Sequence, residues 1–149
     1  MGGTICREVR EDGVRVGFEL MDLSTEQRGW LAHINLHDGP KIGKYTVNLI
    51  DLDVLAASAI VDAVGNAEVL AIDEVGPMEL LSAAFSAALV HAMESGKPLL
   101  VTVHHDLEHP LVKTIKTRKD AEVIHVTHDN RASLHTKIAE KLINQCLIC

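Results

Sequence analysis

Three kinds of feature are scarce in this sequence, and each scarcity excludes a class of protein. Only three cysteines, an odd number, occur among the 149 residues, which argues against a disulfide framework and favours a reducing compartment. No apolar run approaches the roughly 20 residues of a membrane-spanning helix, and the N-terminus lacks an apolar signal core. Lysine and arginine total 14 against 21 acidic residues, and the resulting net charge of −7 disfavours nucleic-acid binding. We therefore expect a cytoplasmic protein that binds neither membranes nor nucleic acid.

The hydrophobic content is sufficient for a folded core. Hydrophobic residues make up 47% of the chain, and its length fits one domain, so we expect residues 1–149 to form a single domain. The chain ends in Cys146-Leu147-Ile148-Cys149, which matches both a redox C-x-x-C pair and a prenylation box. No polybasic segment precedes these residues, and the end of an apolar helix explains them better.

The first third of the chain has the alternating pattern of β-strands. Asp12-Gly13 is a strong hairpin signal, which predicts that residues 4–11 pair with residues 14–22. Two further short strands are expected at residues 28–36 and 45–49. This part of the chain is therefore predicted to be β-rich.

From residue 51 onward the pattern alternates between helices and strands. We predict strands at residues 69–72, 99–103 and 122–127. The helices expected around them are one from an Asp51 cap to a stop at Gly65, one at 79–95, one at 110–117 and one capped by Asn130. Such alternation indicates an α/β fold with a mainly parallel sheet, whose ligand site lies at the carboxyl ends of the strands.

Polar residues follow the predicted parallel strands. Asp73 and Glu74 come after an apolar run and before Gly76-Pro77, which is typical of a Walker B strand. In P-loop nucleoside-triphosphate hydrolases, the first acid at such a strand end helps to hold Mg²⁺, and a neighbouring acid can orient the attacking water. The alternative is that the two acids cap the helix that begins near Glu79. The polar residues after the other two strands are His104, His105, Thr127, Asp129, Asn130 and Arg131.

Two of these groups have simpler explanations. Asn130 would cap the last helix with or without a ligand, and only Arg131 beside it suggests more. The nine histidines match no spacing of a zinc motif, so we predict no dedicated transition-metal site.

The partner of a Walker B strand, a phosphate-binding P-loop, is missing from these residues. A P-loop has the pattern G-x-x-x-x-G-K-[ST], because glycine amides wrap the phosphates, a lysine reaches them and a hydroxyl binds Mg²⁺. Residues 39–45 come closest, but one residue too few separates the glycines, and Tyr45 stands where the hydroxyl ligand belongs. The following residues have an extended pattern, whereas a P-loop opens a helix. We interpret residues 39–45 as unrelated to a P-loop.

Five segments in order give the chain a more specific resemblance. They are residues 15–25 (RVGFELMDLST), 43–49 (GKYTVNL), 72–80 (IDEVGPMEL), 97–104 (KPLLVTVH) and 126–131 (VTHDNR). Together they closely resemble the thermophile-type nucleoside-triphosphatase family, which includes the vertebrate cancer-related nucleoside-triphosphatase. The resemblance covers nearly the whole chain. It implies a RecA-like P-loop fold, a three-layer α/β sandwich, and Mg²⁺-dependent hydrolysis of ATP, GTP and other nucleoside triphosphates to diphosphates with loose base selectivity.

The resemblance also implies roles for individual residues. Asp73 matches the acid associated with Mg²⁺, and Glu74 matches the acid that activates water. Asn130 and Arg131 match the segment near the base. The remaining assignments are His104 at the end of a phosphate-sensing strand, Lys44 and Arg28 in the β-rich excursion over the site, and Arg118 as a charge-stabilising arginine.

The chain departs from the family at its start. Family members begin with a strand, the P-loop and a helix before the pair that stands here as Gly2-Gly3, so about 25 to 30 residues have no counterpart. We therefore expect an N-terminally truncated domain whose hydrolysis is weak or absent without the P-loop. A nucleotide kinase and a non-catalytic interaction protein are the alternatives.

The missing strand leaves a gap in the expected sheet. In RecA-like folds the P-loop strand lies between the strands that match residues 99–103 and 123–127. Open strand edges leave backbone groups unpaired at about 1–3 kcal/mol each. We expect the gap to be filled by direct closure of these strands, by residues 1–11 or by another chain, which makes self-association possible.

Overall fold

The computed structural model describes residues 1–146. The chain divides into two compact units, Met1–Leu107 and Glu108–Cys149, and each is described by itself. Residues 147–149, and with them most of the terminal cysteine motif, lie outside the described residues. Among residues 1–146, no helix combines the length and the apolar character needed to cross a membrane.

The predicted N-terminal hairpin is confirmed. β1 (Gly2–Glu11) and β2 (Val14–Asp22) pair antiparallel around a turn in which φ is 48° at Asp12 and 79° at Gly13. A tight hairpin turn of this kind requires left-handed backbone at both central residues, and Asp and Gly tolerate it. Three shorter strands continue the sheet, namely β3 (Arg28–His33), β4 (Lys41–Ile42) and β5 (Tyr45–Val47).

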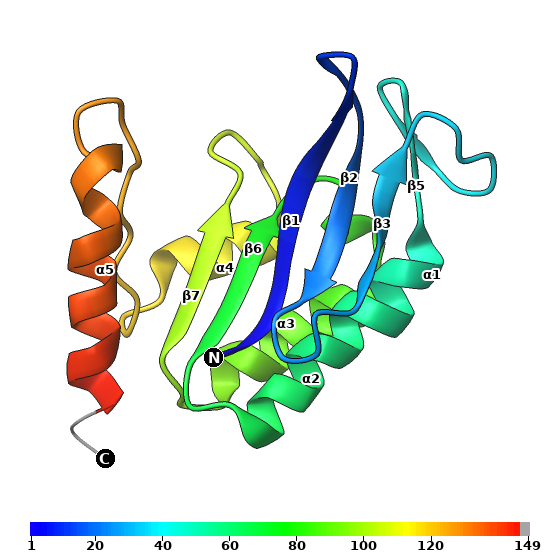
Figure 1. The fold of residues 1–149 in the computed structure, drawn as a ribbon. Coiled ribbons are helices and arrows are strands. Elements are labelled where there is room, and N and C mark those ends of the chain that lie inside the picture. Colours follow the sequence, from blue (N-terminus) through cyan, green and yellow to red (C-terminus); the bar gives the residue numbers. More distant parts are fainter. Residues whose placement is uncertain (147–149) are drawn as a thin grey trace. The chain divides into compact units, whose positions relative to one another are not determined.

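The strands of residues 1–107 form one sheet in the order β4-β5-β3-β2-β1-β6-β7 (Figure 1). β6 (Leu70–Val75) is parallel to β1 on one side and to β7 (Leu99–Val103) on the other. β1 to β5 form antiparallel ladders, so the β-rich excursion is hydrogen-bonded into the same sheet as the parallel strands. The predicted α/β class is confirmed.

The ladder between β1 and β6 depends on a glycine. It runs from the pair Gly2 and Leu70 to the pair Ile5 and Asp73, after which β1 continues past it (Figure 1). Gly3 has a φ of 119°, and a Cβ atom there would lie 2.1 Å from a backbone carbonyl oxygen of β6. Only glycine fits such a position. β1 therefore approaches the strand that carries Asp73 because residue 3 has no side chain.

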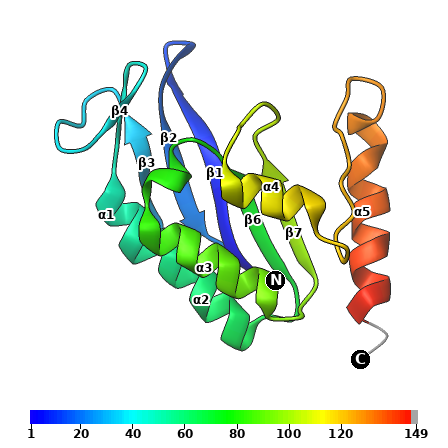
Figure 2. The ribbon, with the colours of Figure 1, turned by 180° about the vertical axis from the view of Figure 1, so that it is seen from behind.

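Helices cover one face of this sheet. The first is continuous from α1 (Leu49–Asp51) through a π-helical turn, η1 (Leu52–Ala56), into α2 (Ala57–Asn66). α3 (Ala83–Glu94) lies beside α2 on the same face (Figures 1 and 2). The largest buried side chains of helices and strands form the core between them, among them Leu20, Leu52, Ile60, Leu70, Ile72, Phe85 and Leu89.

The predicted cap of the first helix is wrong. Asn48 caps it instead, since its side chain accepts a hydrogen bond of 3.1 Å from the Asp51 amide. The Asp51 carboxylate accepts a bond of 2.7 Å from the amide of Trp30 on β3. The side chain of an acid near the start of a helix can bind either an amide of that helix or another backbone amide nearby. Here the Asp51 side chain binds β3, so it does not cap the helix. The helix also continues past the predicted stop at Gly65 to Asn66.

The helix predicted for residues 79–95 is split in two. A short 3-10 turn, η2 (Glu79–Leu81), ends at Ser82, whose extended backbone interrupts the helix before α3 begins. The Ser82 hydroxyl accepts a hydrogen bond of 2.9 Å from the Phe85 amide and donates one to the Asp53 carboxylate on η1. This serine therefore caps α3 and ties it to the first helix.

Replacing Ser82 by alanine should lower the free energy of unfolding by about 1–2 kcal/mol, because α3 loses its cap. Urea denaturation followed by circular dichroism measures the loss. Ser58→Ala, at an exposed position of α2, removes a hydroxyl that caps nothing and should change stability by less than about 0.5 kcal/mol. Equal stability of the two variants would contradict the capping role of Ser82.

The described part of the C-terminal unit contains two helices, α4 (Pro110–Thr117) and α5 (Arg131–Cys146). The strand predicted at residues 122–127 is wrong, since residues 121–127 have no regular secondary structure. A short apolar run forms a strand only where another strand offers backbone partners, and residues 108–146 contain none.

The predicted closure of the gap beside β7 fails for the same reason. The segment that would pair with β7 is not a strand, and residues 1–11 pair with β2 and β6 instead. Within residues 1–107, β7 has a ladder partner on one side only. Pairing with another chain stays a prediction.

Candidate functional site

Asp73 and Glu74 lie near the carboxyl end of β6, which runs from Leu70 to Val75 and therefore includes the two acids that were predicted to follow a strand at residues 69–72. The strand begins with the buried residues Leu70–Ile72, and the two acids that follow are half-buried. The peptide bond between the two acids is cis. Asp73 pairs with Ile5 on β1 and accepts a hydrogen bond from the hydroxyl of Thr102 on β7. Its carboxylate is therefore held by a neighbouring strand.

A third carboxylate, which the sequence reasoning missed, lies next to this pair. Glu79 is 3% exposed, and its Oε2 accepts a hydrogen bond of 3.1 Å from the Gly76 amide. A Cβ atom at residue 76 would lie 2.8 Å from that oxygen and 2.9 Å from Oε1 of Glu74. The carboxylates of Glu74 and Glu79 thus converge on Gly76, in space that any other side chain would take. We call Asp73, Glu74 and Glu79 the acidic cluster.

The helix-capping alternative for Asp73 and Glu74 is wrong. Ser82 caps α3, and no side chain caps η2. Asp73 contacts β7 instead, and Glu74 has no hydrogen-bond partner among residues 1–146. The Glu74 carboxylate is therefore free to face a ligand, whereas one oxygen of Asp73 is already bound by Thr102.

Burial and negative charge raise the pKa of two groups in this region. Burial raises the pKa of Glu79 from 4.5 to about 7, and the charges of Glu74 and Asp73 add to the rise. The pKa of Cys6, on β1, rises to about 12 through its own burial and then through the charges of the acidic cluster. Cys6 is therefore a neutral thiol at neutral pH.

Asp73 has the oxygen chemistry of a Mg²⁺ ligand, but the side chains around it do not complete a set of ligands. Within the described chain, no group of three histidine, cysteine, aspartate or glutamate side chains could hold a metal ion. Mg²⁺ is commonly held by one or two carboxylates, with phosphate oxygens and water completing its shell. The Asp73 carboxylate, one oxygen of which is held by Thr102, has the chemistry of such a carboxylate ligand.

The backbone of His104 lies next to the end of β6. Its amide donates a hydrogen bond of 3.1 Å to the carbonyl oxygen of Val75, which joins the end of β7 to the end of β6. Its imidazole is exposed. The structure thus brings together three of the predicted site residues, Asp73, Glu74 and His104.

Lys44 and Arg28 lie elsewhere in the sheet. Lys44 occupies the turn between β4 and β5, and strands β3, β2 and β1 separate β5 from β6. Its ammonium lies 5.4 Å from the ring centre of Tyr45. Arg28 begins β3 and forms an ion pair of 3.0 Å with Glu19 on β2. Their roles at the site stay predictions.

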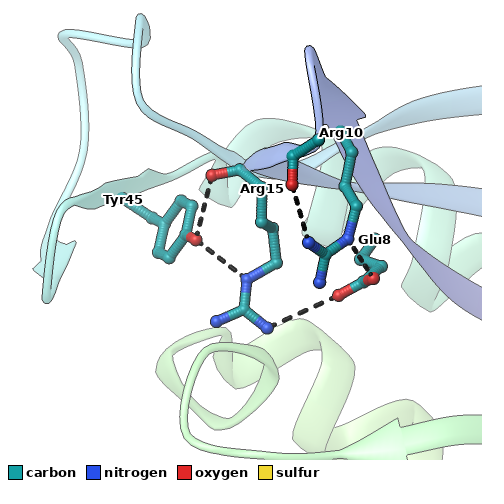
Figure 3. A network of polar contacts seen from close by, with 5 residues as sticks. Glu8, Arg10, Arg15 and Tyr45 are labelled. Atoms are coloured by element: carbon teal, nitrogen blue, oxygen red, sulfur yellow. Dashed lines mark hydrogen bonds and ion pairs between the residues drawn. The ribbon is translucent and has the colours of Figure 1, made fainter.

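A cationic network that the sequence reasoning missed lies near the turn of the β1–β2 hairpin (Figure 3). The Arg15 side chain donates a hydrogen bond of 2.9 Å to the Tyr45 hydroxyl and lies 5.1 Å from the ring centre of Phe18. Glu8 forms ion pairs with Arg10 at 2.7 Å and with Arg15 at 3.5 Å. The hairpin places the two arginines opposite each other, so Glu8 offsets their repulsion. The sequence pattern that could have predicted this network is the pair Arg10 and Arg15, which lie at equivalent positions on the two sides of the predicted turn.

The remaining predicted site residues belong to the C-terminal unit. Arg118 donates hydrogen bonds of 2.8 and 2.6 Å to the two carboxylate oxygens of Asp120. Arg131 is the exposed first residue of α5. Their roles toward phosphate and base stay predictions.

Asn130 begins α5 with its backbone rather than with its side chain. Its carbonyl oxygen accepts a hydrogen bond of 3.0 Å from the Leu134 amide. Its side chain binds the preceding loop, accepting a bond of 2.8 Å from the Thr127 amide and donating one of 2.7 Å to the His125 carbonyl oxygen. The loop borders a cavity of about 220 Å³ whose lining includes Lys137.

Comparisons with known proteins agree with these features. The family model described as NTPase matches residues 1–139. The chain is 40% identical over 143 residues to nucleoside-triphosphatase THEP1 of Thermofilum pendens, across 95% of this chain and 79% of that protein. It is also 40% identical over 145 residues to nucleoside-triphosphatase THEP1 of Methanosarcina acetivorans, across 97% of this chain and 81% of that protein.

A solved structure extends the likeness to three dimensions. The crystal structure of THEP1 from the hyperthermophile Aquifex aeolicus matches with a TM-score of 0.83 and 28% sequence identity, covering 95% of this chain and 83% of that one. The fold is therefore that of a P-loop NTPase, and the resemblance carried by the five sequence segments is confirmed. By the match over residues 1–139 and by its relatives, the chain belongs to the NTPase family.

Proposed function

We propose that this chain hydrolyses nucleoside triphosphates, ATP and GTP among them, to diphosphate and phosphate in a Mg²⁺-dependent reaction. The observation that carries the proposal is the pair Asp73 and Glu74 at the carboxyl end of β6, between β1 and β7. Parallel strands of α/β sheets present ligand sites at this end. The names of the relatives support the substrate class.

Glu74 is the group proposed to orient water. Its carboxylate is half-buried and makes no hydrogen bond within the described chain, so it can accept one from a water molecule. Asp73 has a different role, because Thr102 holds one of its oxygens in place. Asp73 would help to hold Mg²⁺, which when bound offsets the charge of the phosphate oxygens. His104, at the end of β7, would face the terminal phosphate.

The phosphate-binding side of the reaction has no counterpart among these 149 residues. No segment matches G-x-x-x-x-G-K-[ST], and residues 39–45 contain β4 and the turn that leads into β5, with a φ of 59° at Gly43. A P-loop opens a helix whose amides face the phosphates, and these residues do not. Loss of one preorganised donor typically slows catalysis by about 10²–10³-fold. We therefore propose weak ATP binding and slow turnover for the 149 residues.

Single-turnover hydrolysis tests the proposal. With the chain in molar excess over γ-labelled ATP, we expect slow Mg²⁺-dependent release of phosphate above the rate without protein, and the same with GTP. Asp73→Asn should reduce this rate and raise the Mg²⁺ concentration for half-maximal rate by about tenfold, because a neutral amide binds the ion less well than a carboxylate.

Asp62→Asn is the matched control, since Asp62 is an exposed acid on α2. It should leave both the rate and the Mg²⁺ dependence unchanged. Phosphate release no faster than without protein, or release that does not depend on Mg²⁺, would contradict the proposed reaction.

A further inference from the structure

Glu79 is a buried acid to which the proposed reaction assigns no role. Its side chain is 3% exposed, and burying a carboxyl group is costly unless it gains partners. It accepts a hydrogen bond from the Gly76 amide in the turn after β6, and its own backbone also favours the charged carboxylate. A neutral side chain such as asparagine could close a turn at less cost. The acid therefore calls for an explanation beyond the stability of the turn.

The surroundings of Glu79 link it to Glu74. Both carboxylates converge on Gly76, where a side chain would lie within 3 Å of an oxygen of each. The titratable groups that act on Glu79 are Glu74 and Asp73 on β6, and the Cys6 thiol on β1 lies in the same field. No cation is among them. Because like charges repel, the position of the Glu74 carboxylate depends on the state of Glu79.

We propose that Glu79 is a positioning residue for Glu74. Glu79 anchors the Gly76 amide, and through the turn after β6 it sets the orientation in which Glu74 meets the attacking water. The inference rests on the proposed function, because it requires Glu74 to act on water. Glu79 itself touches neither substrate nor water. An ionised carboxylate holds an amide more tightly than a neutral acid does, so the turn is best fixed when Glu79 is charged.

An NMR titration tests the anchoring without nucleotide. The amide signal of Gly76 should shift as the pH passes about 7, because its hydrogen-bond acceptor gains a charge there. Glu79→Gln keeps an acceptor oxygen but cannot ionise, so the shift should disappear, whereas Glu68→Gln at an exposed position should preserve it. A wild-type Gly76 signal that stays constant from about pH 5 to about pH 9 would overturn the proposal.

Hydrolysis supplies a readout that a purely structural role would not move. Above about pH 7, Glu79→Gln should lower kcat about tenfold with KM unchanged, whereas near pH 6 it should match the wild type. The reason is that the variant resembles the neutral acid, which is the wild-type form only at the lower pH. If the ratio of kcat in Glu79→Gln to kcat in the wild type were the same at both pH values, the role of Glu79 would be structural and the proposal would be overturned.

Gly76→Ala displaces the two carboxylates without changing their chemistry. The new methyl group would meet the flexible ends of the Glu74 and Glu79 side chains, so the fold should persist while kcat falls about tenfold. Gly65→Ala, where no atom lies within 4 Å of the added carbon, is the control. Unchanged kcat in Gly76→Ala would overturn the proposal. A wild-type chain without any turnover would overturn the proposed function instead, and the Gly76 signal would then decide whether Glu79 anchors the turn.

Discussion

Glu74→Gln should slow single-turnover hydrolysis by at least ~10²-fold while leaving nucleotide affinity nearly unchanged. Glutamine keeps the size and shape of the side chain but lacks the negative charge that orients water. Glu74 makes no hydrogen bond within residues 1–146, so the substitution breaks none in the fold. Phosphate release with the chain in excess over Mg-ATP measures the rate, and calorimetric titration measures the affinity.

Glu94→Gln, at the exposed end of α3, is the control for this substitution and should leave the rate unchanged. An unchanged rate in Glu74→Gln would assign the water-orienting role to another group. His104 would be the first group to test, because its backbone joins the ends of β6 and β7. A loss of rate together with affinity would show that Glu74 binds the nucleotide rather than the water.

The second large effect concerns stability. Owing to Glu79, the free energy of unfolding should fall by up to about 3 kcal/mol as the pH rises from about 5 to about 8. The Glu79 pKa is about 7 in the folded chain, against an ordinary value of 4.5. Between these values the folded chain holds a proton that the unfolded chain has released, so a rise in pH favours unfolding. The stabilisation is complete below the ordinary value and is lost once the pH passes about 7.

Urea denaturation at several pH values measures this effect, and Glu79→Gln isolates it. The wild type and the variant differ only at residue 79, so the difference between the two curves reports on Glu79. The variant should depend less on pH and should be the more stable protein at the upper end of the range. Two parallel curves would show that Glu79 does not hold a proton in the fold.

Signals that lie within a few residues of each other predicted much of the fold. Asp12-Gly13 favours a turn with left-handed backbone, and the structure contains this turn. The turn brings the two strands of the hairpin together. The apolar run of residues 99–103 became β7 with the predicted bounds, and residues 110–117 became α4. In each case the residues that decide the structure are neighbours in the sequence.

The corrections concern contacts between distant residues. Asp51 is a residue type that often caps helices, but its carboxylate accepts a hydrogen bond from the Trp30 amide instead. Trp30 is distant in the sequence, so no local pattern predicts this contact. Residues 122–127 have the composition of a strand, but a strand needs a neighbour that supplies backbone partners. Local propensity is overridden when a tertiary contact binds the same atoms.

In the candidate site, too, local sequence patterns predicted some residues, whereas residues that depend on three-dimensional contacts were missed. Asp73 and Glu74 were located because an apolar run ends in two acids, which is a local pattern. Glu79 resembles any acid at the start of a helix, and only its burial and its bond to Gly76 distinguish it. Arg118 was predicted through the family resemblance, and Asn130 was predicted both from its place after an expected strand and through the resemblance; the structure shows each bound to residues close to it in the sequence.

The parallel position of β6 has a consequence for the order in which the molecule assembles. The β1–β2 hairpin closes a two-residue turn and can form early, whereas β6 pairs only with segments far away in the sequence, β1 before it and β7 after it. The long segments between such strands must first come together at a cost in conformational entropy, so ladders between distant strands form slowly. We therefore expect the strand that presents Asp73 and Glu74 to be completed late in folding, once β1 and β7, which lie near the two ends of Met1–Leu107, have both paired with it.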